Sequence, residues 1–183
     1  MAKTKTKTKT KTKTKTKTKT SKKINARYLP NKLTKKDKVA QLRMLNKSRK
    51  MYRRGVYYTR SKVKSFKSKP SRHIKNAMVL YKVDNVAPNK QLSLATGCSV
   101  SALKKIVRKG QGAYFSSGSR PNQTGQSWGL ARLASAITSG KAAAVDFDIL
   151  DKGCDHKKKA FIMAMKAKKK YGNGLSKAKK VKV

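Results

Sequence analysis

The chain has 183 residues, of which 50 are Lys or Arg and six are acidic, so its formal net charge is +44. All six acids are aspartates, which leaves few carboxylates for paired acid–base catalysis or for a site that holds a hard metal ion. We therefore expect a protein that is not an enzyme and needs neither a metal nor a cofactor, with apolar residues for one small core.

No apolar run approaches the roughly 20 residues of a membrane-spanning helix, and the N-terminus has no apolar stretch typical of a secretory signal. We therefore expect an intracellular protein with no membrane partner. Two cysteines, Cys98 and Cys154, are too few for a disulfide scaffold, and we predict small, reduced, buried or partly buried thiols. A zinc site that adds His73 and His156 would need an irregular ligand spacing, so no metal site is predicted.

Composition divides the chain into four segments, 1–23, 24–75, 76–155 and 156–183. The two terminal segments are the richest in lysine, and the third is the least basic. We therefore place the compact core in the third segment and expect basic arms and straps around it.

The first segment holds nine consecutive Lys-Thr dipeptides from Lys3 to Thr20. Self-repulsion and the lack of apolar residues favour a disordered arm, which either only solvates the chain or follows a phosphate backbone. Neutralising about nine phosphates predicts a log–log salt slope near −8 on duplex DNA. The candidate nucleic-acid-binding residues of the arm are Lys3, Lys5, Lys7, Lys9, Lys11, Lys13, Lys15, Lys17 and Lys19.

The second segment begins with a predicted basic helix that Thr34 caps and Gly55 stops. Its apolar positions recur every three or four residues, so it packs on the core, lies on a polyanion, or does both. The packing residues are Val39, Leu42 and Leu45; the cations on the other faces are Arg43, Arg49, Lys50, Arg53 and Arg54. After the helix, Tyr57, Tyr58 and Phe66 alternate with cations, which predicts either stacking on single-stranded nucleic acid or an extended strap anchored to the core.

The third segment starts with a short helix or strand at residues 77–81 and continues into a stretch that resembles a helix-turn-helix. A first helix ends at Thr96, Gly97 makes the turn, Ser99 caps the second helix and Gly110 ends it. The expected contacts between the two helices come from Leu92, Leu94, Val100, Leu103 and Ile106.

In DNA-binding versions of this motif, the early exposed residues of the second helix meet base edges. Here these residues are Ser99, Ser101, Ala102, Lys104 and Lys105, and none is a bidentate base reader. We therefore predict sequence-independent phosphate contacts from Lys104, Lys105, Arg108 and Lys109. The alternative is a pair of helices that only packs.

Glycine, serine and proline are dense between Gly110 and Gly125, which predicts a loop. Either Thr124 or Ser127 then caps a helix that runs to Ile137, with Trp128 plugging the core at its start. The loop residues 116–120 offer hydroxyls, backbone N–H groups and the Arg120 guanidinium to an anion. In the alternative interpretation, Arg120 and Arg132 hydrogen-bond to carbonyls of the loop.

The run from Lys109 to Thr124 reads KGQGAYFSSGSRPNQT and is followed by Trp128, Ala131-Arg132-Leu133 and Ser135. With these motifs, residues 60–154 resemble an uncharacterised small domain of large double-stranded DNA viruses and some tailed bacteriophages. The resemblance implies a protein that a virus encodes and packages in its particle, and it implies no reaction.

The fourth segment is predicted to form a helix from an Asp155 cap to a stop at Gly172, followed by a lysine-rich tail that resembles a nuclear localisation signal. Its apolar patch is short, so nucleic acid is preferred over an anionic membrane surface. The candidate phosphate contacts are Lys168, Lys169 and Lys170. The acids at positions 146 and 155 are expected to cap helices or to pair with lysines.

Together these patterns predict a mainly α-helical small domain with a helix-turn-helix-like pair and a long Gly/Ser loop, flanked by disordered basic tails. The expected function is largely sequence-nonspecific binding of nucleic acid, mainly double-stranded DNA, that neutralises or condenses a viral genome in the virion. During infection the protein would be in the host nucleus or cytoplasm. The alternative is a structural capsid or core protein that contacts other virion proteins and turns its basic arms to the genome.

Overall fold

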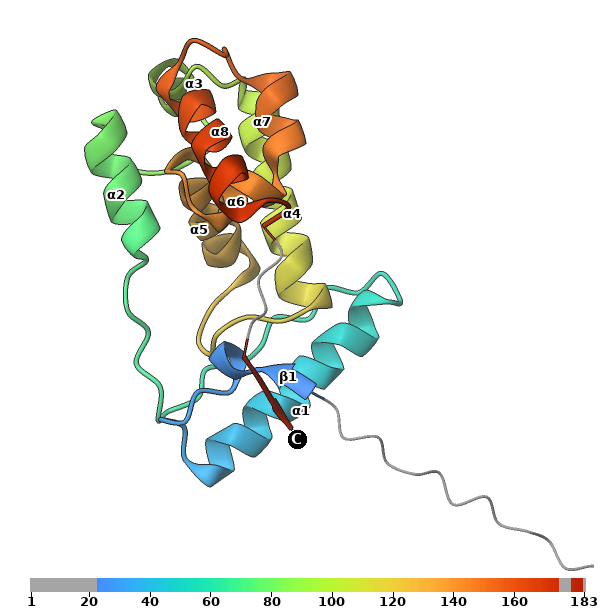
Figure 1. The fold of residues 1–183 in the computed structure, drawn as a ribbon. Coiled ribbons are helices and arrows are strands. Elements are labelled where there is room, and N and C mark those ends of the chain that lie inside the picture. The colour runs from blue at the N-terminus through green and yellow to red at the C-terminus, as the bar shows by residue number, and fades with distance from the viewer. Residues whose placement is uncertain (1–22, 175–178, 183) are drawn as a thin grey trace, which may run out of the picture.

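The computed structural model describes residues 23–174 and 179–182, and this part of the chain is mainly α-helical, as predicted (Figure 1). The nine arm lysines from Lys3 to Lys19 lie outside the described residues. The helices are α1 (Lys35–Tyr52), α2 (Arg72–Tyr81), α3 (Lys90–Thr96), α4 (Val100–Ser116), α5 (Gly125–Ile137), α6 (Lys141–Val145), α7 (Phe147–Gly153) and α8 (Lys159–Tyr171). The strands are β1 (Lys23–Asn25) and β2 (Lys180–Lys182), and β1 leads into the one-turn 3-10 helix η1 (Ala26–Tyr28).

Helices α4 and α5 pack side by side at the centre of the core, and α2, α3, α6, α7 and α8 cover them (Figure 1). Most of the buried side chains here are aliphatic, and α5 and α8 add alanines that let neighbouring helices approach closely. The fully buried aliphatic residues include Leu92, Leu103, Ile106, Leu133, Ile137 and Leu150. Because α8 contributes Ala160, Phe161, Ala164 and Ala167 to the same cluster, the core continues beyond residue 155.

The predicted turn between α3 and α4 is present. Gly97 has φ +73°, a left-handed conformation that suits glycine, and the Ser99 hydroxyl accepts a hydrogen bond from the Ala102 N–H at 3.2 Å. The prediction that Leu94 is buried was wrong, because its side chain is 73% exposed. Val100 is only half-buried.

The prediction that Gly110 ends α4 and begins the loop was also wrong. The helix continues through Gly110 and Gly112 to Ser116, and the loop is confined to residues 117–124. Glycine is tolerated inside this helix because Gly110 lies where α4 meets α5, and the contact leaves no room for a side chain. Thr124 caps α5 in a reciprocal pair with Ser127, and the helix ends at Ile137.

Helix α1 lies across the end of the core at which α4 ends (Figure 1). Thr34 caps it as predicted, accepting a hydrogen bond from the Asp37 N–H at 3.3 Å. Leu45 packs with Ile24 and Leu29 in a second, smaller apolar cluster. Val39 does not take part, because its side chain is 51% exposed.

Within the described residues, β1 and β2 form a two-stranded antiparallel sheet, which pairs Ile24 with Val181. This pairing extends to Lys23 and Lys182, and the Ala26 N–H adds a hydrogen bond to the Lys179 carbonyl at 2.8 Å. Residues 180–182 of the lysine-rich tail are therefore paired, where the sequence predicted a flexible tail.

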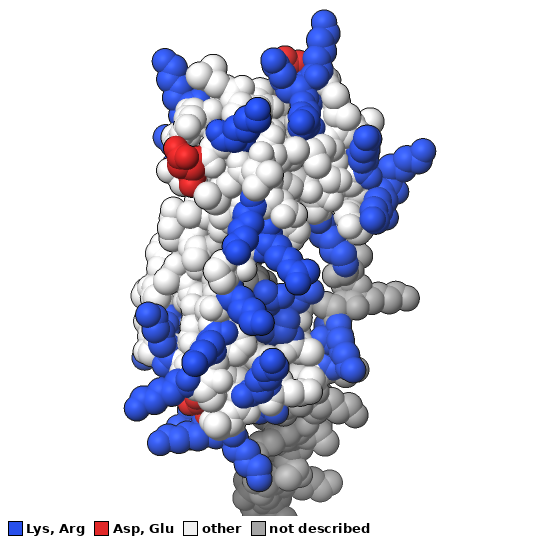
Figure 2. All heavy atoms as spheres, turned by 90° about the vertical axis from the view of Figure 1, so that its left-hand side faces the viewer, with Lys and Arg blue, Asp and Glu red and all other residues white. Residues whose placement is uncertain are grey.

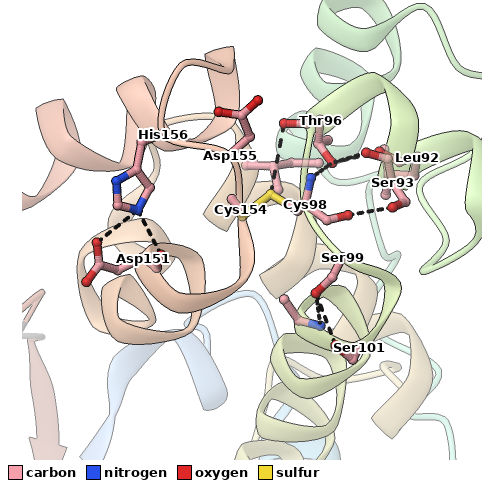
Figure 3. The surroundings of a disulfide bond; sticks show 12 residues. Leu92, Ser93, Thr96, Cys98, Ser99, Ser101, Asp151, Cys154, Asp155 and His156 are labelled. Atoms are coloured by element: carbon pink, nitrogen blue, oxygen red, sulfur yellow. Dashed lines mark hydrogen bonds and ion pairs between the residues drawn. A yellow bond between two sulfur atoms is a disulfide. The ribbon is translucent and has the colours of Figure 1, made fainter.

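Cys98 and Cys154 form a disulfide, so the prediction of two reduced thiols was wrong (Figure 3). The short segments around them are hydrogen-bonded antiparallel: the Ser99 N–H donates to Gly153 O at 2.7 Å, and the Asp155 N–H donates to Gly97 O at 2.8 Å. This pairing places both sulfurs on one side of the ribbon. Both cysteines are buried, as expected.

Helix α8 begins at Lys159, after a turn in which the Asp155 carboxylate accepts a hydrogen bond from the Lys157 N–H at 2.9 Å. Asp155 was therefore wrongly predicted as the cap, although the stop at Gly172 is present. Helices α6 and α7 were not predicted. None of the helices in residues 23–174 and 179–182 combines the length and hydropathy that crossing a membrane requires.

Candidate nucleic-acid interface

The most regular group of predicted phosphate contacts lies on the solvent-facing side of α4. Lys104, Lys105 and Arg108 are all exposed. At 100° per residue, their Cβ atoms fall within a sector of about 100° opposite the buried side of the helix. One rigid element therefore presents three cations in one direction.

Lys109, the fourth predicted contact on α4, points elsewhere. Its Nζ lies 2.9 Å from the Asp146 Oδ1 atom. The same carboxylate accepts two hydrogen bonds from Arg132, from Nε and Nη2, each at 2.7 Å. Asp146 is fully buried, so Lys109 and Arg132 neutralise an internal acid, and the expectation that Asp146 pairs with a lysine is confirmed.

The first turn of α4 is less open than in a groove-reading helix. Ala102, predicted to be exposed, is buried, and a Cβ on Gly153 of α7 would come 2.4 Å from its Cβ. Helix α7 flanks an open pocket of about 240 Å³ beside this turn and contributes the carboxylate of Asp148 to its lining. Lys105 and Lys152 line the same pocket, so Asp148 offsets only part of the positive charge there. Because Ala102 is buried and α7 flanks the first turn, the N-terminal end of α4 is poorly placed to read bases, while its outer face stays accessible.

The C-terminal end of α1 brings a second group of cations close to α4. Arg49 is half-buried and donates to the Ser117 carbonyl from Nε at 3.2 Å and from Nη2 at 2.6 Å. It therefore ties α1 to the start of the loop. The other three predicted contacts, Lys50, Arg53 and Arg54, are exposed.

Residues 56–70 form the extended strap that was one of the two predictions for this stretch. Asn122 holds it from the loop: its side chain accepts from the Val63 N–H at 2.7 Å and donates to the carbonyls of Val63 at 3.0 Å and Phe66 at 2.5 Å. Its own φ is +58°, a conformation that Asn adopts more readily than most residues. The Asn122 side chain thus forms the hydrogen bonds to the strap backbone that a neighbouring strand would otherwise provide.

Arg60 fixes the strap to the core, a role that the sequence does not distinguish from that of the other cations in this stretch. It is 7% exposed, and its guanidinium donates to the Ser48 and Ser119 hydroxyls and to the Tyr114 carbonyl at 2.7–3.2 Å. It also lies 3.8 Å from the centroid of the Tyr114 ring. Burial lowers the pKa of Arg60, and these contacts replace the lost hydration. The only signal in the sequence was an arginine among lysines.

These contacts decide between the two interpretations of the Gly/Ser loop. Ser119 is buried against Arg60, and the Ser117 carbonyl is occupied by Arg49, so residues 116–120 form no open anion cradle. Arginines do hold the loop through hydrogen bonds, as the structural interpretation predicted, but they are Arg49 and Arg60. Arg132 binds Asp146 instead, and Arg120 is exposed. Arg120 stays a candidate only as a surface cation.

The third group of cations lies at the end of α8. Lys168, Lys169 and Lys170 are exposed, and the Lys168 Nζ lies 3.9 Å from the centroid of the Phe147 ring. Figure 2 shows Lys and Arg side chains over the whole height of one face of the molecule and acidic side chains at only a few points. The exposed cations are therefore distributed over several helices. Those on α4 are the most regularly arranged, because they share one face of a single helix.

The part of the chain that the structure describes contains no group of three or more His, Cys, Asp or Glu side chains placed to hold a metal ion. Comparison with curated proteins and with solved structures finds no match for this chain. A family model does match residues 40–156, which include α1 from its second turn, the strap and the core helices up to α7. The chain therefore belongs to the family of unknown function DUF5824.

Proposed function

We propose that this protein binds nucleic acid largely without sequence preference and neutralises or condenses a genome. The observation that carries the proposal is the outer face of α4, where Lys104, Lys105 and Arg108 point into solvent from a rigid helix. Asp148 lines the same pocket as Lys105, but within the described residues none of these three cations forms an ion pair with a carboxylate. A surface of this kind attracts polyanions and releases their counterions.

In the proposed mechanism, the Lys-Thr arm supplies most of the neutralisation and the helical unit fixes the orientation. Lysines at every second position follow a phosphate backbone without a fixed geometry, whereas the α4 cations keep a constant spacing. Neither group offers the bidentate side chains that distinguish bases. Affinity should therefore depend strongly on salt and weakly on sequence.

The resemblance of residues 60–154 to a domain of large DNA viruses and tailed bacteriophages supports a viral source, packaging in the virion and double-stranded DNA as the main partner. The protein would reach the genome in the host nucleus or cytoplasm. This part of the proposal depends on the resemblance alone.

A salt titration of duplex binding tests the role of the arm. The full chain should show a steep log–log slope, and removing residues 1–22, which leaves β1 intact, should make the slope shallower by about 8. An unchanged slope would remove the arm from the mechanism.

A charge-matched pair of variants tests the α4 face. Replacing Lys104, Lys105 and Arg108 with Gln should weaken binding at every salt concentration and reduce the slope by about 3. Replacing three exposed lysines near α8 with Gln removes the same charge, and it should have a smaller effect; the residues are Lys157, Lys159 and Lys166. Equal effects would mean that net charge, and not the α4 face, governs binding.

A structural virion protein is the second candidate, and two exposed apolar side chains favour it. Val79 on α2 is 81% exposed and Leu94 on α3 is 73% exposed, and these two helices contact each other. Such residues suit a protein–protein contact. Fractionation of disrupted particles separates the two candidates: the genome-associated fraction supports nucleic-acid binding, and the shell fraction supports the structural role.

A further inference from the structure

Three aromatic rings meet on the surface where the strap leaves α1. Tyr52 and Phe115 lie nearly parallel, with ring centroids 6.4 Å apart and planes 8° apart. Tyr57 stands on edge against both, at 5.1 Å from Phe115 and 6.0 Å from Tyr52. We call these three residues the aromatic platform.

Tyr57 is the exposed member of the platform. Its side chain is 69% exposed, whereas Tyr52 and Phe115 are half-buried. A tyrosine that only anchored the strap would bury its ring, as Tyr114 does beneath Arg60. The contacts with Tyr52 and Phe115 restrict the Tyr57 ring and leave most of it in solvent.

The backbone between Tyr52 and Tyr57 is also fixed. The Gly55 N–H donates to Tyr52 O and the Val56 N–H donates to Met51 O, both at 3.0 Å, which is the pattern of a Schellman turn. Gly55 has φ +76°, and a Cβ there would meet nothing within 4 Å. Glycine is therefore favoured at this position by its backbone conformation and not by crowding. The platform is therefore preorganised and loses little entropy when a ligand stacks on it.

Arginines flank the platform along the chain. Arg53 and Arg54 occupy the turn between the two tyrosines and are exposed, and Arg49 lies one helical turn before Arg53. The sequence from Lys38 to Val83 contains no acid, so no carboxylate of that stretch opposes a phosphate beside the rings. An exposed aromatic ring among arginines suits an unpaired base flanked by phosphates.

We propose that the aromatic platform binds single-stranded nucleic acid by stacking an unpaired base on Tyr57, while Arg53 and Arg54 contact the adjacent phosphates. The inference deepens the proposed function, on which it depends, by giving the same protein an additional contact for unpaired segments of a nucleic acid. In a duplex both faces of each base are covered by its neighbours. Duplex DNA therefore binds the platform only through the attraction between its phosphates and the arginines. Ribose and deoxyribose strands share the chemistry that the platform recognises.

The test separates stacking from charge by measuring how affinity depends on salt. The full chain is titrated with an oligothymidylate, with the matching oligouridylate and with a DNA duplex of the same length. Charge sets the slope of log affinity against log salt, whereas a stacked base adds a contribution that persists when the line is extrapolated to high salt. Tyr57→Leu keeps an apolar side chain against Tyr52 and Phe115 and removes the aromatic face.

The expected result is that Tyr57→Leu weakens binding of both single strands by about 5- to 150-fold at every salt concentration, with an unchanged slope and unchanged duplex affinity. Tyr57→Phe should bind like the unmodified chain. Val79→Ala, which shortens an exposed apolar side chain on α2, should also have no effect. Loss of affinity for the ribose strand alone or the deoxyribose strand alone would identify which one the platform serves.

Equal single-strand affinity of Tyr57→Leu and the unmodified chain would overturn the inference and leave the proposed function intact. If the unmodified chain bound neither single strands nor duplex, the proposed function itself would fail. Melting curves show whether Tyr57→Leu is folded. Should it unfold, photocrosslinking of a bromouracil-containing strand to the unmodified chain decides: a crosslink at Tyr57 supports stacking, and crosslinks only at other residues contradict it.

Discussion

Gly110 of α4 lies directly against the backbone of Gly129 of α5: a Cβ on Gly110 would come 2.6 Å from the Gly129 Cα. In the opposite direction, a Cβ on Gly129 would come 2.8 Å from the Val107 carbonyl oxygen. The backbones of the two central helices are therefore in contact, and this contact sets the distance between α4 and α5.

Gly110→Ala should destabilise the protein even though alanine favours helix. The helix preference contributes up to about 1 kcal/mol in favour of alanine, but the neighbour is backbone and cannot move aside. Overpacking of this kind typically costs about 1–3 kcal/mol, so we expect a net loss in the free energy of unfolding measured with urea. Gly112→Ala is the control: its Cβ would lie 3.4 Å from the Tyr52 hydroxyl, so it should be neutral or stabilising.

Asp146→Asn should destabilise the core more strongly. The fully buried carboxylate balances Arg132, whose side chain is 20% exposed, and removing it leaves that cation poorly compensated. Loss of one partner of a buried ion pair costs about 3–5 kcal/mol. Lys109→Met should cost much less, because this side chain is 48% exposed and can be solvated. Equal losses in the two variants would show that Lys109, and not Arg132, is the main partner.

Reduction of the Cys98–Cys154 disulfide should lower stability. The bond joins residues that are 56 apart in sequence and fastens the start of α4 to the end of α7, so it restricts the unfolded chain considerably. We expect a loss of about 3 kcal/mol in the free energy of unfolding with dithiothreitol. The Cys98→Ala, Cys154→Ala double variant should match the reduced protein and should not respond to the reagent. Two free thiols in non-reducing buffer would contradict the bond.

Acidification should loosen the strap at Asp37. The Ser65 hydroxyl and N–H donate to this carboxylate at 2.6 and 2.8 Å and hold the pKa of Asp37 below its ordinary value. Because the pKa is lower in the folded state, this contribution is complete above the unfolded pKa of about 3.9 and is lost as pH falls through the folded pKa. The protection factor of the Ser65 amide, which corrects for the intrinsic pH dependence of hydrogen exchange, should therefore fall in acid. Ser65→Ala should raise the pKa of Asp37, as followed by NMR; an unchanged pKa would exclude these hydrogen bonds as its cause.

Local signals in the sequence predicted the ends of several helices. Thr34, Ser99 and Thr124 cap helices as expected, and Gly97 and Gly172 lie at the predicted ends. The same rules failed at Gly110, because a glycine that ends a helix and a glycine that admits a neighbouring helix look alike in sequence. The difference depends on Gly129, which no local pattern connects to it.

The candidate site was predictable only in part. Lys104, Lys105 and Arg108 follow from helical periodicity once Ser99 fixes the start of the helix. The internal contacts of Lys109 and Arg49 could not be predicted in this way, because each side chain binds a partner distant in sequence. The partners are Asp146 and Ser117, respectively. The burial of Arg60 was equally invisible, since Ser48, Tyr114 and Ser119 come together only in the fold.

By itself, the sequence determined the excess of positive charge, the helical class and the places where α1, α4 and α5 begin, because composition and capping act within a few residues. The tertiary structure alone decided which cations stay in solvent and which become internal. It also brought Cys98 to Cys154 and set Tyr57 against Phe115. Such contacts join residues that the chain keeps far apart, and their free energy depends on burial and close packing that no short stretch of sequence contains.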